Sequence, residues 1–308
     1  MNPRAMKSKI RVTIEIIFCI IIFAFLISKI DVKETLTILK EVNLFWILIG
    51  VGISIFSTFI TGYSLKVLFD SVKHIPFLEW MRYYLLGFSM GLILPGRTGD
   101  LSIIYFLKEK GFDIGESTAL TVIDKLITLI IFGTIATIGV FTIFNSSQLY
   151  LGLALTLFCI VGGLFLFTGI GRRFIRKIIG KHAEKFKGFN RTFKNLIQHH
   201  KDKIAINIII TLYRPIGNTL LMVAVLKALG IGDLSFFYLM IINAITLIVS
   251  LIPLTPNGLG IREGVGTLLF STIGVTAEAT VAMYVILLMI NYTAGILGTT
   301  YYLLTKKV

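Results

Sequence analysis

Two short segments of the sequence carry charged side chains beside Pro and Gly, inside stretches that are otherwise apolar. The first segment contains Arg97 and Asp100, and the second contains Arg262 and Glu263. A carboxylate next to a guanidinium keeps both groups ionised in a low dielectric, and the guanidinium retains donors that match phosphate geometry. The pattern predicts a site for an anionic head group. The alternative is that the two pairs are internal ion pairs that only hold their own loops.

Pro and Gly give both segments an irregular backbone. Pro lacks a donor for helix hydrogen bonds, while Gly accepts unusual dihedral angles and lets an anion approach backbone N–H groups. Such backbone is tolerated at membrane depth only where it is buried in protein or lines a cavity. The residues expected to shape the two breaks are Pro95, Gly96 and Gly99 in the first and Pro253, Pro256, Gly258 and Gly260 in the second.

Three more charged residues, Asp124, Lys125 and Arg214, lie well inside apolar segments. A charge at this depth costs about 2.5–3.5 kcal/mol on insertion scales and marks a functional site by default. Asp124 is a candidate partner for Arg97 or Arg214. These charged residues therefore either contact a substrate or form satisfied buried pairs. The predicted substrate-binding residues are therefore Arg97, Asp100, Asp124, Lys125, Arg214, Arg262 and Glu263.

The composition places these charges in a membrane. The chain has 308 residues, of which 56% are hydrophobic and 15% charged, with a net charge of +14. The charged share is well below the roughly 25% of soluble domains and excludes an ordinary soluble enzyme. Six segments are long enough to span the bilayer as helices: 12–29, 44–69, 117–144, 149–169, 204–226 and 280–304. We therefore predict an all-α, polytopic membrane protein with about six full transmembrane helices, plus a short amphipathic surface helix at 32–41.

Two further apolar stretches, 83–107 and 237–272, contain the breaks and are predicted to be re-entrant or broken helical hairpins. If both are re-entrant and the N-terminus is cytoplasmic, 22 Lys and Arg lie on the cytoplasmic side and four outside. If both cross fully, the numbers become 10 and 16. The positive-inside rule favours the re-entrant arrangement in the cytoplasmic membrane, with both chain ends cytoplasmic. The cations that remain at membrane depth are Arg97, Lys125, Arg214 and Arg262.

The sequence also repeats its own spacing. Asp100 is followed by a Gly eleven residues later and an Ala nineteen residues later, and Glu263 is followed by the same types at the same distances. We interpret the chain, 1–308, as a single integral membrane domain built from an inverted repeat, with halves at about 44–144 and 204–304. Chance similarity between apolar segments is the alternative. Inverted repeats are common in secondary transporters, with the site between the broken elements.

The segment 171–203 is strongly basic. It contains eleven Lys and Arg against two acids, and its apolar residues recur at helical spacing. This pattern is typical of an amphipathic helix on the cytoplasmic leaflet, attracted to anionic lipid. It serves either as a lipid-collecting platform or as a topology determinant that anchors the loop. Anionic membrane lipids are thus the predicted partners, and no nucleic acid is expected.

Metal and cofactor chemistry have little support in the sequence. His182, His199 and His200 lack the helical spacing and supporting acid of a metal site, so no metal is predicted. A nucleotide-binding loop of the Walker type and a nucleophile–His set are also missing from the sequence. We therefore expect no cofactor, and we expect that the chain is not an enzyme.

The two breaks together resemble the lysylphosphatidylglycerol synthase transmembrane-region family. The motifs are the segment 94–100, which runs through a Gly111 turn into the Asp124-Lys125 helix, and the segment 256–264 before the last span. The resemblance implies a flippase-like fold and function, because the family includes the flippase half of enzymes that aminoacylate phosphatidylglycerol. The chain ends at Val308, just after the last span, so synthase activity is not expected.

The sequence therefore predicts a translocase for an anionic or phosphate-bearing lipid, with Arg97 and Arg262 holding the phosphate and Asp100 and Glu263 tuning the charge. A secondary transporter of a small solute or ion is one alternative. A non-catalytic membrane partner of a lipid-linked glycosyltransferase is another, since related domains accompany such enzymes. A homo-oligomer is a further option, because small residues suited to helix packing occur along the chain.

Overall fold

The computed structural model describes residues 31–93, 102–143, 188–232, 234–250 and 258–305. Within these ranges the secondary structure is helical and contains no strand, as predicted. The expected spans at 12–29 and 149–169 lie outside the described residues. So do the first break with Pro95, Gly96, Arg97, Gly99 and Asp100, and the start of the second with Pro253 and Pro256.

Four helical stretches are long and apolar enough to cross a membrane. They are α3 (Leu44–Phe69), α6 (Ile114–Ile143), α14 (Ala277–Thr305) and the pair α10 (Lys201–Thr211) and α11 (Tyr213–Ala228). The α10–α11 pair is interrupted at Leu212 because Pro215 lacks an N–H and its ring crowds the carbonyl of Thr211. These stretches confirm a multi-pass membrane protein.

The two apolar stretches with Pro and Gly breaks are each divided into two helices, as expected. The first gives α4 (Phe77–Ile93) and α5 (Ser102–Phe106), with the 3-10 turn η2 (Leu107–Lys110) behind it. The second gives α12 (Phe236–Ser250) and α13 (Ile261–Ser271). A helix of 17 residues such as α4 is about 25 Å long, shorter than a bilayer core of about 30 Å. Re-entrance itself stays a prediction.

A matching turn precedes α6 and α14. Gly111 has a φ of 83° and Gly274 a φ of 79°, a left-handed conformation that favours Gly. In each turn the next N–H donates to a carbonyl five residues earlier, Phe112 to Leu107 at 3.3 Å and Val275 to Phe270 at 3.2 Å. The long helix then begins three residues after the Gly in both cases.

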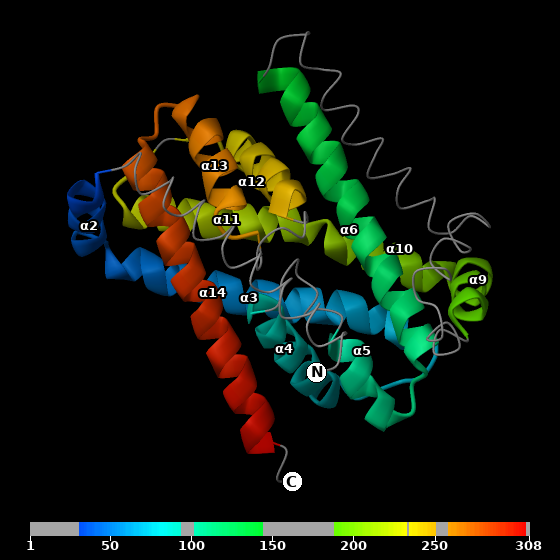
Figure 1. The fold of residues 1–308 in the computed structure, drawn as a ribbon. Coiled ribbons are helices and arrows are strands. Elements are labelled where there is room, and N and C mark those ends of the chain that lie inside the picture. The colour runs from blue at the N-terminus through cyan, green and yellow to red at the C-terminus, as the bar shows by residue number, and fades with distance from the viewer. Residues whose placement is uncertain (1–30, 94–101, 144–187, 233, 251–257, 306–308) are drawn as a thin grey trace, which may run out of the picture.

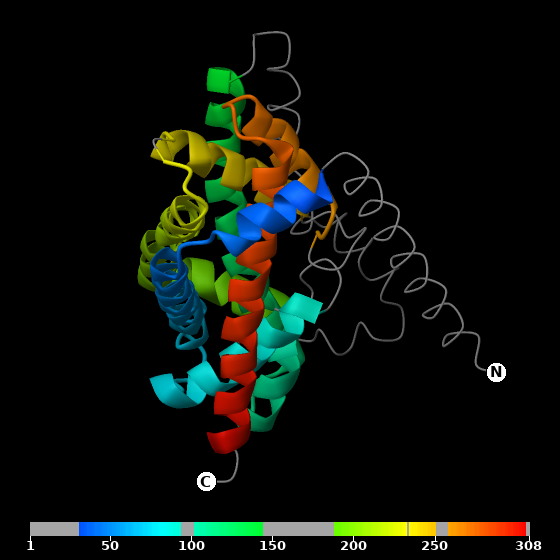
Figure 2. The ribbon, with the colours of Figure 1, turned by 90° about the vertical axis from the view of Figure 1, so that its left-hand side faces the viewer.

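The helices pack in pairs that cross the two halves of the sequence. In Figure 1, α3 and the α10–α11 pair lie side by side across the middle, where α3 contacts α11. The helix α4 packs on α14, and α12 packs on α6. Figure 2 shows α6 and α14 with roughly parallel axes and opposite chain directions. Two surface helices complete the set, since α2 (Val32–Lys40) lies on α14 and α9 (Phe189–His199) lies on α6.

The helix α9 is the described part of the basic segment 171–203. It buries Thr192 and Leu196 and exposes Arg191 and Lys194, so it is amphipathic as predicted. The helical pattern does not continue unbroken to residue 203, because α9 ends at His199 and α10 begins at Lys201. The last cations of the segment therefore sit at the start of a membrane-spanning helix.

Candidate functional site

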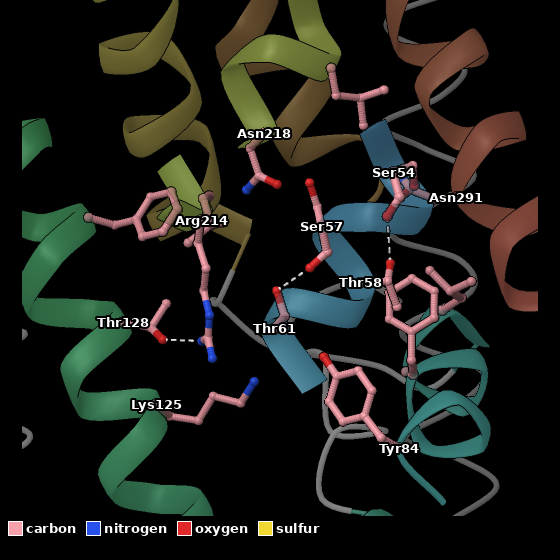
Figure 3. A pocket seen from close by; sticks show the side chains of 16 residues that line it. Ser54, Ser57, Thr58, Thr61, Tyr84, Lys125, Thr128, Arg214, Asn218 and Asn291 are labelled. Carbon is pink, nitrogen blue, oxygen red and sulfur yellow. Dashed lines mark hydrogen bonds between the residues drawn. The ribbon is translucent and has the colours of Figure 1, made fainter. Parts of the chain in front are cut away.

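A polar cavity of about 180 Å³ lies at the centre of the molecule, where the helices of both halves meet. Figure 3 shows its lining, with Lys125 and Arg214 on one side and a row of hydroxyl groups on the other. The lining residues are Ser54, Ser57, Thr58 and Thr61 of α3; Tyr84, Phe88, Gly91 and Leu92 of α4; Lys125, Thr128 and Phe132 of α6; Arg214, Asn218 and Leu221 of α11; Leu247 of α12; and Asn291 of α14.

Arg214 forms a bidentate ion pair with Asp124. Its Nη2 donates to Asp124 Oδ1 at 2.7 Å and its Nη1 to Oδ2 at 3.2 Å, and Nη1 also donates to Thr128 Oγ1 at 2.5 Å. The two residues are only 8% and 2% exposed. Two parallel N–H···O bonds fix the guanidinium plane as well as its position. Of the two partners predicted for Asp124, the structure therefore shows Arg214.

A second layer of polar residues fixes Asp124 from behind. Asn207, which is fully buried, donates from Nδ2 to Asp124 Oδ1 at 3.1 Å and to the carbonyl of Ser64 at 2.8 Å. Ser64 Oγ lies 2.9 Å from Thr211 Oγ1. A carboxylate that is held by two helices besides its own has little freedom to turn away from Arg214. The network therefore connects α3, α6, α10 and α11.

Lys125 follows Asp124 on α6 and, turned by about 100° around the helix, reaches a different space. Its ammonium points into the central cavity, toward Thr61 and Tyr84 (Figure 3). Asp124 instead lines a cavity of about 10 Å³ next to the first one. Lys125 and Arg214 therefore both belong to the lining of the central cavity, and their N–H donors suit an anionic ligand.

The hydroxyl-bearing face of α3 was not predicted. Ser54, Ser57, Thr58 and Thr61 recur at the i, i+3, i+4, i+7 spacing of one helix face, a polar stripe that was visible in the sequence. Thr58 and Thr61 each donate to the carbonyl four residues earlier, at 2.8 Å. Their hydroxyl protons are therefore used within the helix, and what they offer the cavity is acceptor lone pairs.

The second break is built differently. Glu263 accepts a hydrogen bond of 2.5 Å from the N–H of Gly260 and so caps α13. The Arg262 guanidinium lies 5.4 Å from the centre of the Tyr284 ring. Gly258, with a φ of 74°, packs so tightly that a Cβ there would lie 2.5 Å from Ser250 Cβ. Neither charged residue is among the described residues that line the central cavity, and the contacts of both are with other parts of the protein: the Tyr284 ring for Arg262 and the Gly260 N–H for Glu263.

Comparison with known proteins agrees with the two sequence motifs and the helical fold. Residues 12–298 match the model of the lysylphosphatidylglycerol synthase TM region. The chain belongs to this family. A search of curated proteins finds no match. Family membership and the membrane helices together indicate a multi-pass membrane protein whose function concerns membrane lipids.

In this family member the chemistry of the cavity is that of ions and hydrogen bonds. Among the residues that the structure describes, no group of three or more His, Cys, Asp or Glu side chains comes together as a metal site would require. The described lining instead offers N–H donors on α6 and α11 and hydroxyl acceptors on α3. This arrangement suits a ligand with a negative charge at one end and N–H or O–H donors at the other.

Proposed function

We propose that this protein is a lipid translocase of the cytoplasmic membrane, which moves an anionic, phosphate-bearing lipid between leaflets without covalent chemistry. The observation that carries the proposal is the central cavity with Lys125 and Arg214 in its lining. A cation inside membrane helices is costly, and Arg in particular matches the geometry of phosphate. The volume of about 180 Å³ corresponds to roughly six water molecules, enough for a head group but not for acyl chains.

Asp124 acts in this proposal as a resident counter-ion. When no lipid is bound, its carboxylate neutralises Arg214 and keeps the guanidinium oriented. A phosphate that reaches the cavity competes with Asp124 for the same donors and gains Lys125 as a second cation. Release of the phosphate is then assisted, because Asp124 takes its place. Substitution of Asp124 by Asn should therefore tighten lipid binding while it slows turnover.

The helix pairing supports an inverted repeat. The contact of α4 with α14 corresponds to that of α12 with α6, and the contact of α2 with α14 corresponds to that of α9 with α6. Gly111 and Gly274 occupy matching turns, and Ala119 and Ala282, the matching alanines, are both fully buried. With both termini cytoplasmic, two such halves would expose the central cavity to each leaflet in turn. Anionic lipid that gathers at α9 would enter the central cavity from the cytoplasmic leaflet.

Reconstitution in liposomes tests the proposal. The protein is placed in vesicles with a fluorescent anionic lipid, and the fraction in the outer leaflet is followed by a membrane-impermeant quencher. We expect Arg214→Gln and Lys125→Gln to reduce the transbilayer rate by roughly tenfold or more, the value of one charged hydrogen bond. Lys227→Gln is the matched control, because Lys227 lies over the Trp46 ring at 4.7 Å, away from the cavity. Equal transbilayer rates in the wild type and in all three variants would overturn the proposal.

The small cavity favours one second candidate, a transporter of a water-soluble phosphate compound. The same vesicles distinguish the two functions, because a soluble phosphate ester trapped inside would then leave the vesicle while the labelled lipid stays in its leaflet. A partner role beside a glycosyltransferase makes a third prediction, namely that substitution of Lys125 or Arg214 alters neither flux.

A further inference from the structure

A second, larger hollow lies on another face of α3. It measures about 670 Å³. Its lining consists mainly of aromatic and aliphatic side chains, from Phe59, Ile60, Tyr63, Phe77, Ile210 and Tyr213, together with Lys66 and His74. Phe59, Tyr63 and Phe77 are 37%, 46% and 39% exposed. Because α3 spans the membrane, apolar side chains exposed at this depth face acyl chains rather than water.

The lining of this groove contacts the lining of the central cavity at one pair of hydroxyl groups. Ser57 lines the cavity, Tyr213 lines the groove, and their hydroxyl oxygens lie 3.4 Å apart. Next to them, Gly217 lets α11 approach closely, since a Cβ there would lie 2.7 Å from Ser57 Oγ and 2.8 Å from Tyr213 Cε1. Tyr213 also directly precedes Arg214, so neighbouring residues of α11 serve the two spaces.

The Ser57–Tyr213 contact is long for an O–H···O hydrogen bond, whose usual distance is about 2.7–2.8 Å. A bond of this length contributes little to holding the tyrosine in place, and Tyr213 is only partly buried. A turn of the Tyr213 side chain away from Ser57 would open this contact between the two linings.

We propose that the groove binds one acyl chain of the same lipid whose phosphate occupies the central cavity, with Tyr213 as the movable wall between head group and chain. The inference rests on the proposed function. Its support is chemical complementarity across one side chain: a polar, cation-bearing space on one side of Tyr213 and an apolar space open to the bilayer on the other. A phospholipid is the membrane component that combines both chemistries in one molecule.

Tryptophan quenching by brominated lipid tests the groove directly. The groove is labelled at the half-buried Ile60 by Ile60→Trp in a Trp46→Phe background, in which the fully buried Trp80 gives a constant signal. The matched control is Ile138→Trp on α6, which is 55% exposed and lies outside the groove. Each protein is reconstituted in phosphatidylcholine vesicles that contain either brominated phosphatidylglycerol or brominated phosphatidylcholine at equal mole fraction.

We expect the groove tryptophan to prefer the brominated anionic lipid by roughly fivefold, the ratio that one ion pair provides, while the control shows no preference. Lys125→Gln should abolish this preference if the chain in the groove belongs to a lipid held in the cavity. Arg214→Gln is not needed for this arm, so a folding defect caused by the buried Asp124 cannot confuse the result.

The outcomes separate the two proposals. Equal quenching by both lipids at Ile60→Trp, together with transport that depends on Arg214, would overturn the groove and leave the translocase standing. A preference that survives Lys125→Gln would also overturn the inference, because the groove would then bind lipid independently of the cavity. A preference that Lys125→Gln removes, in a protein that moves no lipid, would support the groove and overturn translocation.

Discussion

Arg214 is buried and Arg262 is partly buried, both within apolar stretches of the chain, and their surroundings differ. Arg214 is held by a buried carboxylate and a threonine and lines a polar cavity. Arg262 lies over the ring of Tyr284, beside a glutamate that is occupied in capping a helix. The first arrangement aims a charge at open space, whereas the second uses a charge to join α13 to α14. A buried arginine is therefore informative only together with the space that its donors face.

The largest expected effect comes from breaking the Arg214–Asp124 pair on one side only. Asp124→Ala leaves the guanidinium buried without its carboxylate and should cost about 3–5 kcal/mol of stability, measured as loss of helical signal during unfolding in detergent. The double variant Asp124→Leu with Arg214→Met should regain most of that stability and still fail to move lipid. A double variant that transports would contradict the role of the cavity charges.

A smaller effect is expected behind the pair, at Asn207. Asn207→Ala removes the donor to Asp124 Oδ1 and to Ser64, and should cost about 1–3 kcal/mol because buried acceptors lose their partner. Lipid transport should fall without being abolished, because Arg214 still holds the carboxylate. Asn291→Ala, at the cavity surface on α14, serves as the comparison for loss of an amide that does not contact Asp124.

The second break should respond in stability and not in transport. Glu263→Ala removes the cap of α13 and is expected to cost about 1 kcal/mol, while Glu263→Gln keeps an acceptor at the same position and should cost less. Arg262→Gln loses the contact with the Tyr284 ring, about 0.5–2 kcal/mol. Thermal unfolding and the liposome assay, run side by side, check both. A transport defect in Arg262→Gln that equals that of Arg214→Gln would remove the difference between the two sites.

The smallest effect is expected at an ion pair outside the spanning helices, which calibrates the buried one. Lys110 pairs with Glu79, and the hydrogen bond to that carboxylate raises the pKa of Lys110 above its usual value of 10.5. The stabilisation that accompanies a raised lysine pKa is fully present below the pKa of the unfolded state. It is lost as the pH rises through the pKa of the folded state. Lys110→Met should therefore cost about 0.2–1 kcal/mol at pH 7, less in high salt, and nothing above the folded pKa. A pH-independent difference in melting temperature would contradict the pairing.

Much of the fold could be predicted from the sequence because helix length and apolar content report directly on the bilayer. The span at 44–69 agrees with α3, and the short helix at 32–41 agrees with α2 to within one residue. The interruption at Leu212 was not predicted, although Pro215 directly follows Arg214 in the sequence. A proline near the middle of an apolar run indicates a break or a kink, and packing against α3 decides between them.

The candidate site was predicted in part. The depth of Asp124, Lys125 and Arg214 could be counted along the helices, but their convergence depends on how α6 and α11 cross, which no local pattern encodes. The prediction gave greatest weight to the Pro- and Gly-rich breaks, and the described part of the second break has structural contacts. Arg97 and Asp100 lie outside the described residues, so their role stays a prediction.

The two faces of α3 have a consequence for how this protein tolerates change. Ser57 and Thr61 face the central cavity, while Phe59 and Tyr63 face the groove. Successive residues of a helix are about 100° apart, so a shift of one residue turns polar side chains away from the cavity and apolar side chains away from the groove. Single substitutions affect one compartment at a time, whereas insertion or deletion of one residue near position 58 would misplace both at once. Natural relatives should therefore vary α3 in side-chain type and keep its length, and length changes should be found in the connections before Leu44 and after Phe69.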